Sequence, residues 1–293
     1  MAGEPSLQQE KGGRLAMRAE RIELAGGAAM DVEVAGEGPA LLLLHAGVSE
    51  RHMWDHQWEW LQHEFTVVRW DWRGFGTTPH VPGPFSYADD VIRVMEALNI
   101  AQATLMGCSF GGSVAIQTGV QHPERVERLV LVGSGVPGYE FTNSPEVEAL
   151  FSEAEAALGR EDRAAFLDLM ERIWLVGPNR TADQVDAQYL KRARELLARA
   201  YLPENGAVSQ DAEWSAQGRL SEIQVPVLVI VGDQDVPDIL DGASVLDEAL
   251  PNVSLEVLED AAHLPNLERP RQFDAILSEW LAETGNGSKG SLA

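Results

Sequence analysis

A serine between glycines is the first residue pattern in the sequence that could do chemistry. Ser109 is the central residue of the pentapeptide 107–111, GCSFG, which lies between the apolar run 103–106 and the helical pattern 110–121. A G-x-S-x-G sequence on a sharp turn between a strand and a helix strains the serine backbone and exposes its hydroxyl. The same string recurs by chance in glycine-rich chains. Its context and its partners therefore decide whether Ser109 is a nucleophile.

Two carboxylates and a histidine follow in the chain order nucleophile, acid, histidine. Asp233 and Asp235 come directly after the apolar run 225–231. Both would lie at the carboxyl edge of a parallel sheet, where open α/β sheets place their sites. His263 lies in a loop after the next apolar run, at the position where a catalytic base is expected. The pattern favours a hydrolase with a nucleophilic serine.

The elements that would position these residues alternate between strand and helix. A hairpin is predicted from strands 19–24 and 30–35 around a Gly-Gly turn. The strands predicted after it are 40–44, 65–70, 103–106, 128–132, 225–231 and 253–258, and the helices are 54–63, 87–98, 110–121, 239–249 and 266–282. Continuous apolar strands, each followed by a helix, indicate an α/β fold whose mostly parallel central sheet, of about eight strands, is flanked by helices.

The alternation is interrupted before the apolar run 225–231. From 144 to 218 the chain is rich in Ala, Glu and Arg, with helical periods and no convincing strand. We therefore expect a helical cap inserted into the sheet domain, with flexible ends. The expected parts are a flexible N-terminus 1–18, a core formed by 19–138 and 219–282, a cap 139–218 and a flexible tail 283–293.

Composition and charge restrict the class of protein and its partners. The chain has 293 residues, 45% of them hydrophobic, and a net charge of −24 that disfavours nucleic-acid and membrane partners. The single cysteine, Cys108, allows neither an intramolecular disulfide nor a cysteine-based zinc site. The N-terminal residues lack the apolar stretch of a secretory signal, so we expect a cytoplasmic protein. We expect no metal and no cofactor. The sequence leaves open whether the protein forms homo-oligomers.

Further segments make the sequence resemble the α/β-hydrolase family over residues 19–282. Residues 43–47, LLHAG, resemble the family's His-Gly oxyanion segment, and residues 71–76, DWRGFG, resemble its D-x-R-G-x-G turn. Residues 232–235 and 263–265 resemble its acid and histidine loops. The esterase and lactonase branch with a helical cap, such as the 3-oxoadipate enol-lactone hydrolases, is the branch that the chain resembles most.

The resemblance implies catalytic roles for three side chains. The family's acid is the fourth residue of a G-x-x-D loop, which makes Asp235 the acid and leaves Asp233 to bind loop backbone. Ser109 would attack the substrate after His263 takes its proton, and Asp235 would orient the imidazole. An exchange of the roles of the two aspartates is the alternative.

The resemblance also implies an oxyanion hole made of backbone amides, those of Phe110 and Gly47. One such donor is worth roughly 3 kcal/mol. Val48 is an alternative to Gly47 because this chain has His-Ala-Gly where the family has His-Gly. Val48, Trp174 and Trp214 are further candidates for substrate contact.

Several reactive residue types are expected to be structural. Cys108 is expected to pack away from the serine face, and His45 to fix the loop that it begins. Asp71 and Arg73 are expected to hold their glycine-rich turn through an ion pair.

We therefore predict a cofactor-free serine hydrolase that cleaves a small carboxylic ester or lactone through an acyl-enzyme. Carbon–carbon bond hydrolases, aminopeptidases and hydroxynitrile lyases share the same three catalytic residues and stay open as alternatives. A non-catalytic ligand receptor that kept the fold is the alternative from another class.

Overall fold

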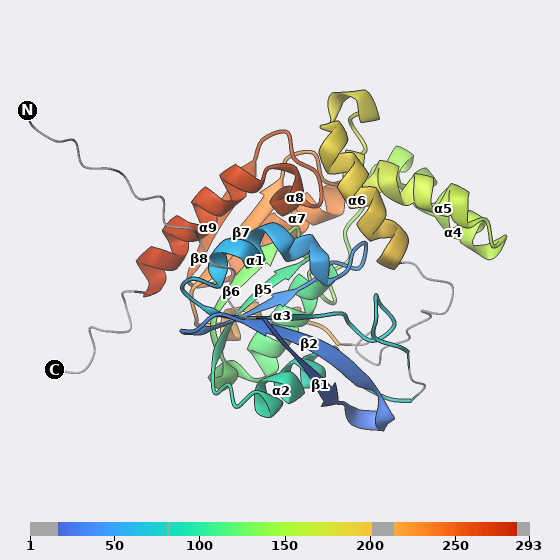
Figure 1. Ribbon diagram of the computed structural model, residues 1–293. Helices are drawn as coiled ribbons and strands as arrows, with labels where there is room; N and C mark the ends of the chain where they lie inside the picture. The colour runs from blue at the N-terminus through green and yellow to red at the C-terminus, as the bar shows by residue number, and fades with distance from the viewer. Residues whose placement is uncertain (1–16, 81–82, 201–213, 286–293) are drawn as a thin grey trace, which may run out of the picture.

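The computed structural model describes residues 17–80, 83–200 and 214–285 and contains one eight-stranded sheet (Figure 1). The strand order is β1-β2-β4-β3-β5-β6-β7-β8. The strands are β1 (Arg18–Glu23), β2 (Ala29–Ala35), β3 (Ala40–Leu44), β4 (Thr66–Trp70), β5 (Ala103–Cys108), β6 (Val126–Val132), β7 (Val227–Gly232) and β8 (Val253–Leu258). β2 pairs antiparallel with β1 and β4, and every other pairing is parallel. The predicted mostly parallel sheet is confirmed.

Helices cover both faces of the sheet, because side chains on each strand alternate between two hydrophobic clusters. Leu42 and Leu44 of β3 belong to the cluster under α2 (Tyr87–Ala97), α3 (Phe110–Gln121) and α7 (Pro237–Ala249). Leu41 and Leu43 belong to the cluster under α1 (Asp55–Leu61) and α9 (Pro270–Gly285). None of the described helices has the length and apolar composition to cross a membrane.

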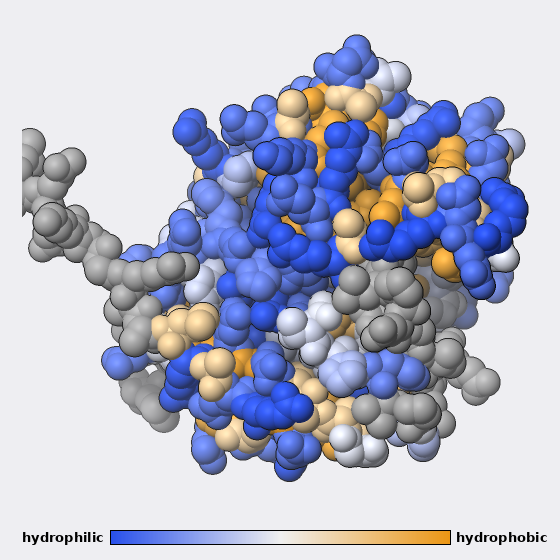
Figure 2. All heavy atoms as spheres, turned by 45° about the vertical axis from the view of Figure 1, so that its right-hand side comes forward, coloured by the Kyte–Doolittle hydropathy of each residue, from blue (hydrophilic) through white to orange (hydrophobic). Residues whose placement is uncertain are grey.

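In the described part of the chain between β6 and β7, all the regular secondary structure is helical. It contains α4 (Pro145–Gly159), α5 (Arg163–Met170), the π-helix η4 (Glu171–Val176), the 3-10 helix η5 (Ala182–Gln184) and α6 (Ala187–Ala200). α4 begins where the Ser144 hydroxyl accepts the Val147 N–H, and α5 where Asp162 accepts the Ala165 N–H. The helices α4 to α6 gather at one end of the sheet (Figure 1), and hydrophobic residues show between hydrophilic ones over this part of the surface (Figure 2).

The last part of the chain departs from the expected single helix 266–282. Two helices occur there, α8 (Pro265–Glu268) and α9. They are separated at Arg269, whose backbone (φ −127°, ψ 54°) is not helical. Proline disfavours helical angles in the residue before it, and Pro270 therefore ends α8. α9 continues to Gly285, inside the segment expected to be a tail, and residues 286–293 lie outside the described ranges.

Candidate active site

The turn that carries Ser109 joins β5 directly to α3. Its backbone angles, φ 52° and ψ −115°, lie in a region that residues other than glycine rarely adopt. The Ser109 N–H donates to the carbonyl oxygen of Val132 on β6 at 2.8 Å. This bond to the neighbouring strand helps to hold the strained turn, and Ser109 stays partly exposed.

The glycines of this turn allow backbone to approach backbone closely. A Cβ at Gly107 would lie 2.3 Å from the carbonyl oxygen of Gly111, and a Cβ at Gly111 would lie 2.3 Å from that of Leu44. Any larger residue would therefore push β3, β5 and α3 apart. Between these glycines, the buried Cys108 thiol lies 3.7 Å from the carbonyl oxygen of His263. Burial, with the nearby Asp235 charge, raises the pKa of this thiol, which makes it a neutral packing group.

Asp235 and His263 meet at the carboxyl ends of β7 and β8. His263 Nδ1 lies 2.8 Å from Asp235 Oδ2, and both side chains are buried. A carboxylate only accepts hydrogen bonds, so Nδ1 carries a proton, and in the neutral imidazole Nε2 is then the nitrogen with the lone pair. The other oxygen, Asp235 Oδ1, accepts the Val236 N–H at 2.8 Å. Asp233, the competing acid, makes no hydrogen bond to His263 in the described part of the chain, and its N–H donates to Leu258.

The outer nitrogen of His263 is buried and unpartnered. Within the described ranges nothing hydrogen-bonds Nε2, and this includes the Ser109 hydroxyl. The Trp174 ring covers the imidazole, with ring centroids 4.2 Å apart, and the Trp174 carbonyl oxygen accepts the His263 N–H at 3.3 Å. Catalytic hydrogen bonds are often long or misaligned without substrate. Nε2 can therefore take a proton from a hydroxyl that moves next to it.

Ser109 opens onto a cavity of about 320 Å³. The cavity is lined by Gly47, Val48, Ser109, Phe151, Ala154, Glu155, Leu158, Phe166, Met170 and Trp174. Three residues picked out from the sequence, Gly47, Val48 and Trp174, thus share one space with Ser109. Trp214 is not among the lining residues, and it packs partly buried against the hydrophobic cluster under α2, α3 and α7.

The sequence analysis missed the cavity wall that α4 and α5 supply. Phe151, Ala154, Glu155 and Leu158 have the i, i+3, i+4, i+7 spacing of one helical face. This spacing shows which side chains share a face, but not what the face covers. The wall is apolar except for Glu155. Across residues 17–80, 83–200 and 214–285, no group of three or more His, Cys, Asp or Glu side chains could hold a metal ion.

The loop after β3 is fixed through His45 and runs beside the start of α3. Trp72 donates its backbone N–H to His45 Nε2 at 3.0 Å, and its indole N–H to the His45 carbonyl oxygen at 3.0 Å. Burial lowers the pKa of His45, so the imidazole is neutral, with its Nδ1 proton directed to the Ala46 carbonyl oxygen at 2.8 Å. A Cβ at Gly47 would lie 3.6 Å from the Phe110 Cβ. The N–H groups of a first helical turn have no partner inside the helix, so free donors of α3 lie next to this loop.

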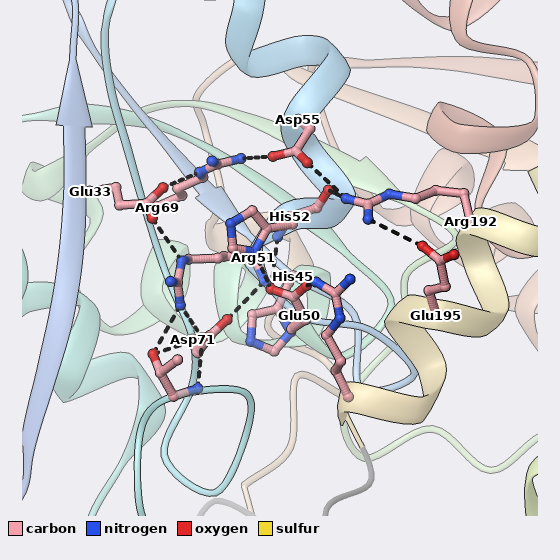
Figure 3. Close-up of polar contacts among 12 residues, drawn as sticks. Glu33, His45, Glu50, Arg51, His52, Asp55, Arg69, Asp71, Arg192 and Glu195 are labelled. Carbon is pink, nitrogen blue, oxygen red and sulfur yellow. Dashed lines mark hydrogen bonds and ion pairs between the residues drawn. The ribbon is translucent and has the colours of Figure 1, made fainter. Parts of the chain in front are cut away.

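The glycine-rich turn after β4 is held by two separate ion pairs. Asp71 accepts the Arg51 N–H at 2.9 Å and also pairs with the Arg51 guanidinium (Figure 3). Arg73 donates to both carboxylate oxygens of the buried Asp90 on α2, at 2.6 and 2.7 Å. The expected pair between Asp71 and Arg73 is therefore wrong, because each side chain finds a nearer partner on another element. Both residues still fix the turn.

Charged side chains connect the residues that follow the β3 loop with α6. Asp55 accepts a hydrogen bond from Arg192 of α6 at 2.7 Å, and Glu50 pairs with Arg199 of α6 at 3.3 Å (Figure 3 labels Asp55, Arg192 and Glu50). Burial would raise the pKa of Glu50, but hydrogen bonds from the ring and backbone of His52, with the charge of that ring, lower it to about 2. Glu50 is therefore an ionised anchor for α6.

A buried ion pair ties η4 to the loop that follows β8. Arg180 donates to both oxygens of Glu268, at 2.9 and 3.2 Å, and to the carbonyl oxygens of Val176 and Asp260, each at 2.8 Å. Glu268 also accepts the Ala262 N–H at 2.8 Å. η4 carries the tryptophan over the imidazole, and the loop carries the imidazole itself. The ion pair between Arg180 and Glu268 thus sets the positions of both the tryptophan ring and the imidazole.

Known proteins share this architecture. A family model described as the alpha/beta hydrolase fold matches residues 39–270. The chain is 29% identical to 3-oxoadipate enol-lactonase 2 of Acinetobacter baylyi, covering 80% of this chain and 86% of that protein. It is 28% identical to 2-hydroxymuconate semialdehyde hydrolase of Pseudomonas sp. strain CF600, covering 89% and 93%. A thermophilic esterase structure from Thermogutta terrifontis superposes with a TM-score of 0.72 at 26% identity, covering 91% of this chain and 99% of that one.

Proposed function

The chain belongs to the α/β hydrolase fold family, and on this premise we propose that it is a serine hydrolase that cleaves a small carboxylic ester or lactone through an acyl-enzyme. One observation carries the proposal. The imidazole of His263 is oriented by Asp235 at 2.8 Å, and its Nε2 is buried without a partner among the described residues. The strained turn of Ser109 stands at the same edge of the sheet. The lactonase and the esterase among the relatives support the substrate class.

The proposed reaction begins at Ser109. Its Oγ bonds to the carbonyl carbon of the substrate while His263 Nε2 takes the hydroxyl proton, and the carbonyl π electrons move onto oxygen. When this intermediate collapses, the bond from carbon to the leaving oxygen breaks and His263 gives that oxygen its proton. Asp235 stabilises the imidazolium between the two transfers. Water then attacks the acyl-enzyme by the same route, which releases the carboxylic acid and restores Ser109.

Backbone amides would stabilise the oxyanion. The donors are the Phe110 N–H at the start of α3 and the Gly47 N–H, with Val48 as the alternative to Gly47. Two features support this assignment: Gly47 lies close enough to Phe110 that an added Cβ would be 3.6 Å from the Phe110 Cβ, and the first N–H groups of α3 have no partner inside the helix. Each donor would lower the barrier by roughly 3 kcal/mol. Residues 139–218, of which 201–213 lie outside the described ranges, would form a cap over the site, between core segments 19–138 and 219–282, with Trp174 against the substrate.

Hydrolysis of p-nitrophenyl acetate tests the proposal. Ser109→Ala should lower the rate by at least about a thousandfold, as in other serine hydrolases that lose the nucleophile. Ser113→Ala is the matched control, because Ser113 lies one helical turn further along α3 and its hydroxyl donates to Gly135 at 3.0 Å. This control should keep turnover within about threefold of the wild type, since it removes a partly buried hydrogen bond and leaves the Ser109 hydroxyl in place. Wild-type turnover by Ser109→Ala would refute the mechanism.

Carbon–carbon bond hydrolysis is a second candidate, favoured by the similarity to the semialdehyde hydrolase. The same three side chains can serve that reaction. A panel of neutral esters, lactones and vinylogous diketones, with analysis of the products, separates the two candidates. Ser109-dependent cleavage of esters or lactones supports the first candidate, and cleavage confined to the diketones supports the second.

A further inference from the structure

Apart from Glu155, the side chains that α4, α5 and η4 supply to the cavity are apolar. α4 supplies Phe151, Ala154 and Leu158, α5 supplies Phe166 and Met170, and η4 supplies Trp174. A cavity of about 320 Å³ lies at the small end of the range for ligand sites. Its walls can cover a short hydrocarbon chain, but they offer few polar partners.

The charges around the cavity favour a neutral occupant. Glu155 is the charged side chain in the lining, and no Lys, Arg or His belongs to the lining within the described ranges. The whole chain carries a net charge of −24, which adds a field that repels anions.

A carboxylate on the acyl group would meet two costs in this cavity. It would leave water for an apolar wall without a cation to pair with. It would also approach the like charge of Glu155. Building on the proposed function, we infer that the enzyme takes esters or lactones with a neutral, apolar acyl group, and that Glu155 is a specificity-determining residue that rejects acyl groups bearing a carboxylate.

Two p-nitrophenyl esters of matched size and equal leaving group test the inference. The rate without enzyme is subtracted for each, because a carboxylate near its own ester also cleaves that ester intramolecularly. One is p-nitrophenyl pentanoate, and the other is the mono-p-nitrophenyl ester of succinic acid, which carries a carboxylate at the end of a chain of similar length. For the wild type, kcat/KM should be higher for the pentanoate by about a hundredfold or more, because the carboxylate loses its hydration without gaining a partner.

Substitutions of Glu155 separate its charge from the apolar wall. Glu155→Gln should reduce the discrimination about fivefold, the effect of one like charge at close range in water, and Glu155→Lys should reduce it further by supplying a counter-charge. The readout is the ratio of kcat/KM for the two esters, because this ratio cancels any effect of a substitution that is common to both substrates. Glu153→Gln is the matched control, since this exposed residue lies two positions away and outside the lining. It should leave the discrimination unchanged.

The outcomes distinguish this inference from the function on which it rests. Equal or preferred turnover of the succinate ester, abolished by Ser109→Ala, would overturn the inference and leave the serine mechanism standing. A loss of discrimination in Glu153→Gln as large as that in Glu155→Gln would remove the role of Glu155. If the wild type hydrolysed neither ester faster than Ser109→Ala, both the function and the inference would fall.

Discussion

Replacing Glu268 by alanine should lower the free energy of unfolding by an amount that follows from its contacts. The carboxylate accepts two hydrogen bonds from Arg180 and one from the Ala262 N–H, and its side chain is 1% exposed. The variant leaves the Arg180 guanidinium, 8% exposed, without its counter-charge. Breaking a buried ion pair from one side costs about 3–5 kcal/mol. Glu268→Gln keeps one acceptor, so its loss should be smaller, about 1.5–3 kcal/mol.

The same substitution should slow catalysis because it displaces the loop that carries His263. Ala262 precedes His263, the proposed catalytic base, and Arg180 holds the neighbouring loop at the Asp260 carbonyl oxygen. A shift of about 1 Å in a catalytic group can cost a hundredfold in rate, so we expect kcat to fall about ten- to hundredfold with little change in KM. A role in stability alone would leave kcat of the folded fraction unchanged.

Urea unfolding followed by tryptophan fluorescence, and kcat on p-nitrophenyl acetate, measure the two effects. Glu222→Gln is the control, because Glu222 forms a similar two-bond pair with Arg219 on the surface. Exposed pairs contribute little, so this variant should match the wild type in both assays. A midpoint for Glu268→Ala that equals that of Glu222→Gln would refute the reasoning.

Three further predictions concern other parts of the site. Asp235→Asn should lower kcat for ester hydrolysis by about four orders of magnitude, because the carboxylate no longer holds the His263 ring in the tautomer that carries its proton on Nδ1. A larger loss in Asp233→Asn would make Asp233 the catalytic acid instead. The folded-state pKa of Glu50, about 2, lies below its ordinary value of 4.5, so its stabilising effect is complete above pH 4.5 and is lost toward pH 2. The gap in unfolding free energy between wild type and Glu50→Gln, measured in urea, should therefore shrink by about 3 kcal/mol over that range, and a constant gap would contradict the assignment. Trp174→Ala should change the ranking of ester substrates about ten- to hundredfold, whereas Trp214→Ala should lower stability and scale all rates alike; a changed ranking for Trp214→Ala would return that residue to the cavity wall.

Local rules explain why the elements around Ser109 could be predicted. The apolar run of β5, the glycines of the turn and the helical period ending before Pro123 act within a few residues of one another. α3 accordingly runs from Phe110 to Gln121, as expected. The break at Pro270 was equally local, because a proline restricts the residue before it, and it was missed.

The cavity wall and the supports of His263 depend on contacts that no local pattern specifies. Arg180 and Glu268 are 88 positions apart in the sequence, and their pairing depends on how the segment after η4 packs on α8. Trp174 reaches the imidazole from a π-helix, which sequence periodicity did not indicate. The face of α4 that carries Glu155 could be drawn from the sequence, but its position above Ser109 could not.

Mass spectrometry of the protein after reaction with p-nitrophenyl N,N-dimethylcarbamate tests the central claim most directly. A serine nucleophile transfers the carbamoyl group to its own hydroxyl, and the carbamoyl-enzyme hydrolyses slowly enough to be isolated. The proposed mechanism predicts one added carbamoyl group, located on the peptide that contains Ser109, and none on Ser109→Ala. A carbamoyl group on another residue, or an unmodified wild-type protein that still hydrolyses esters, would contradict the mechanism.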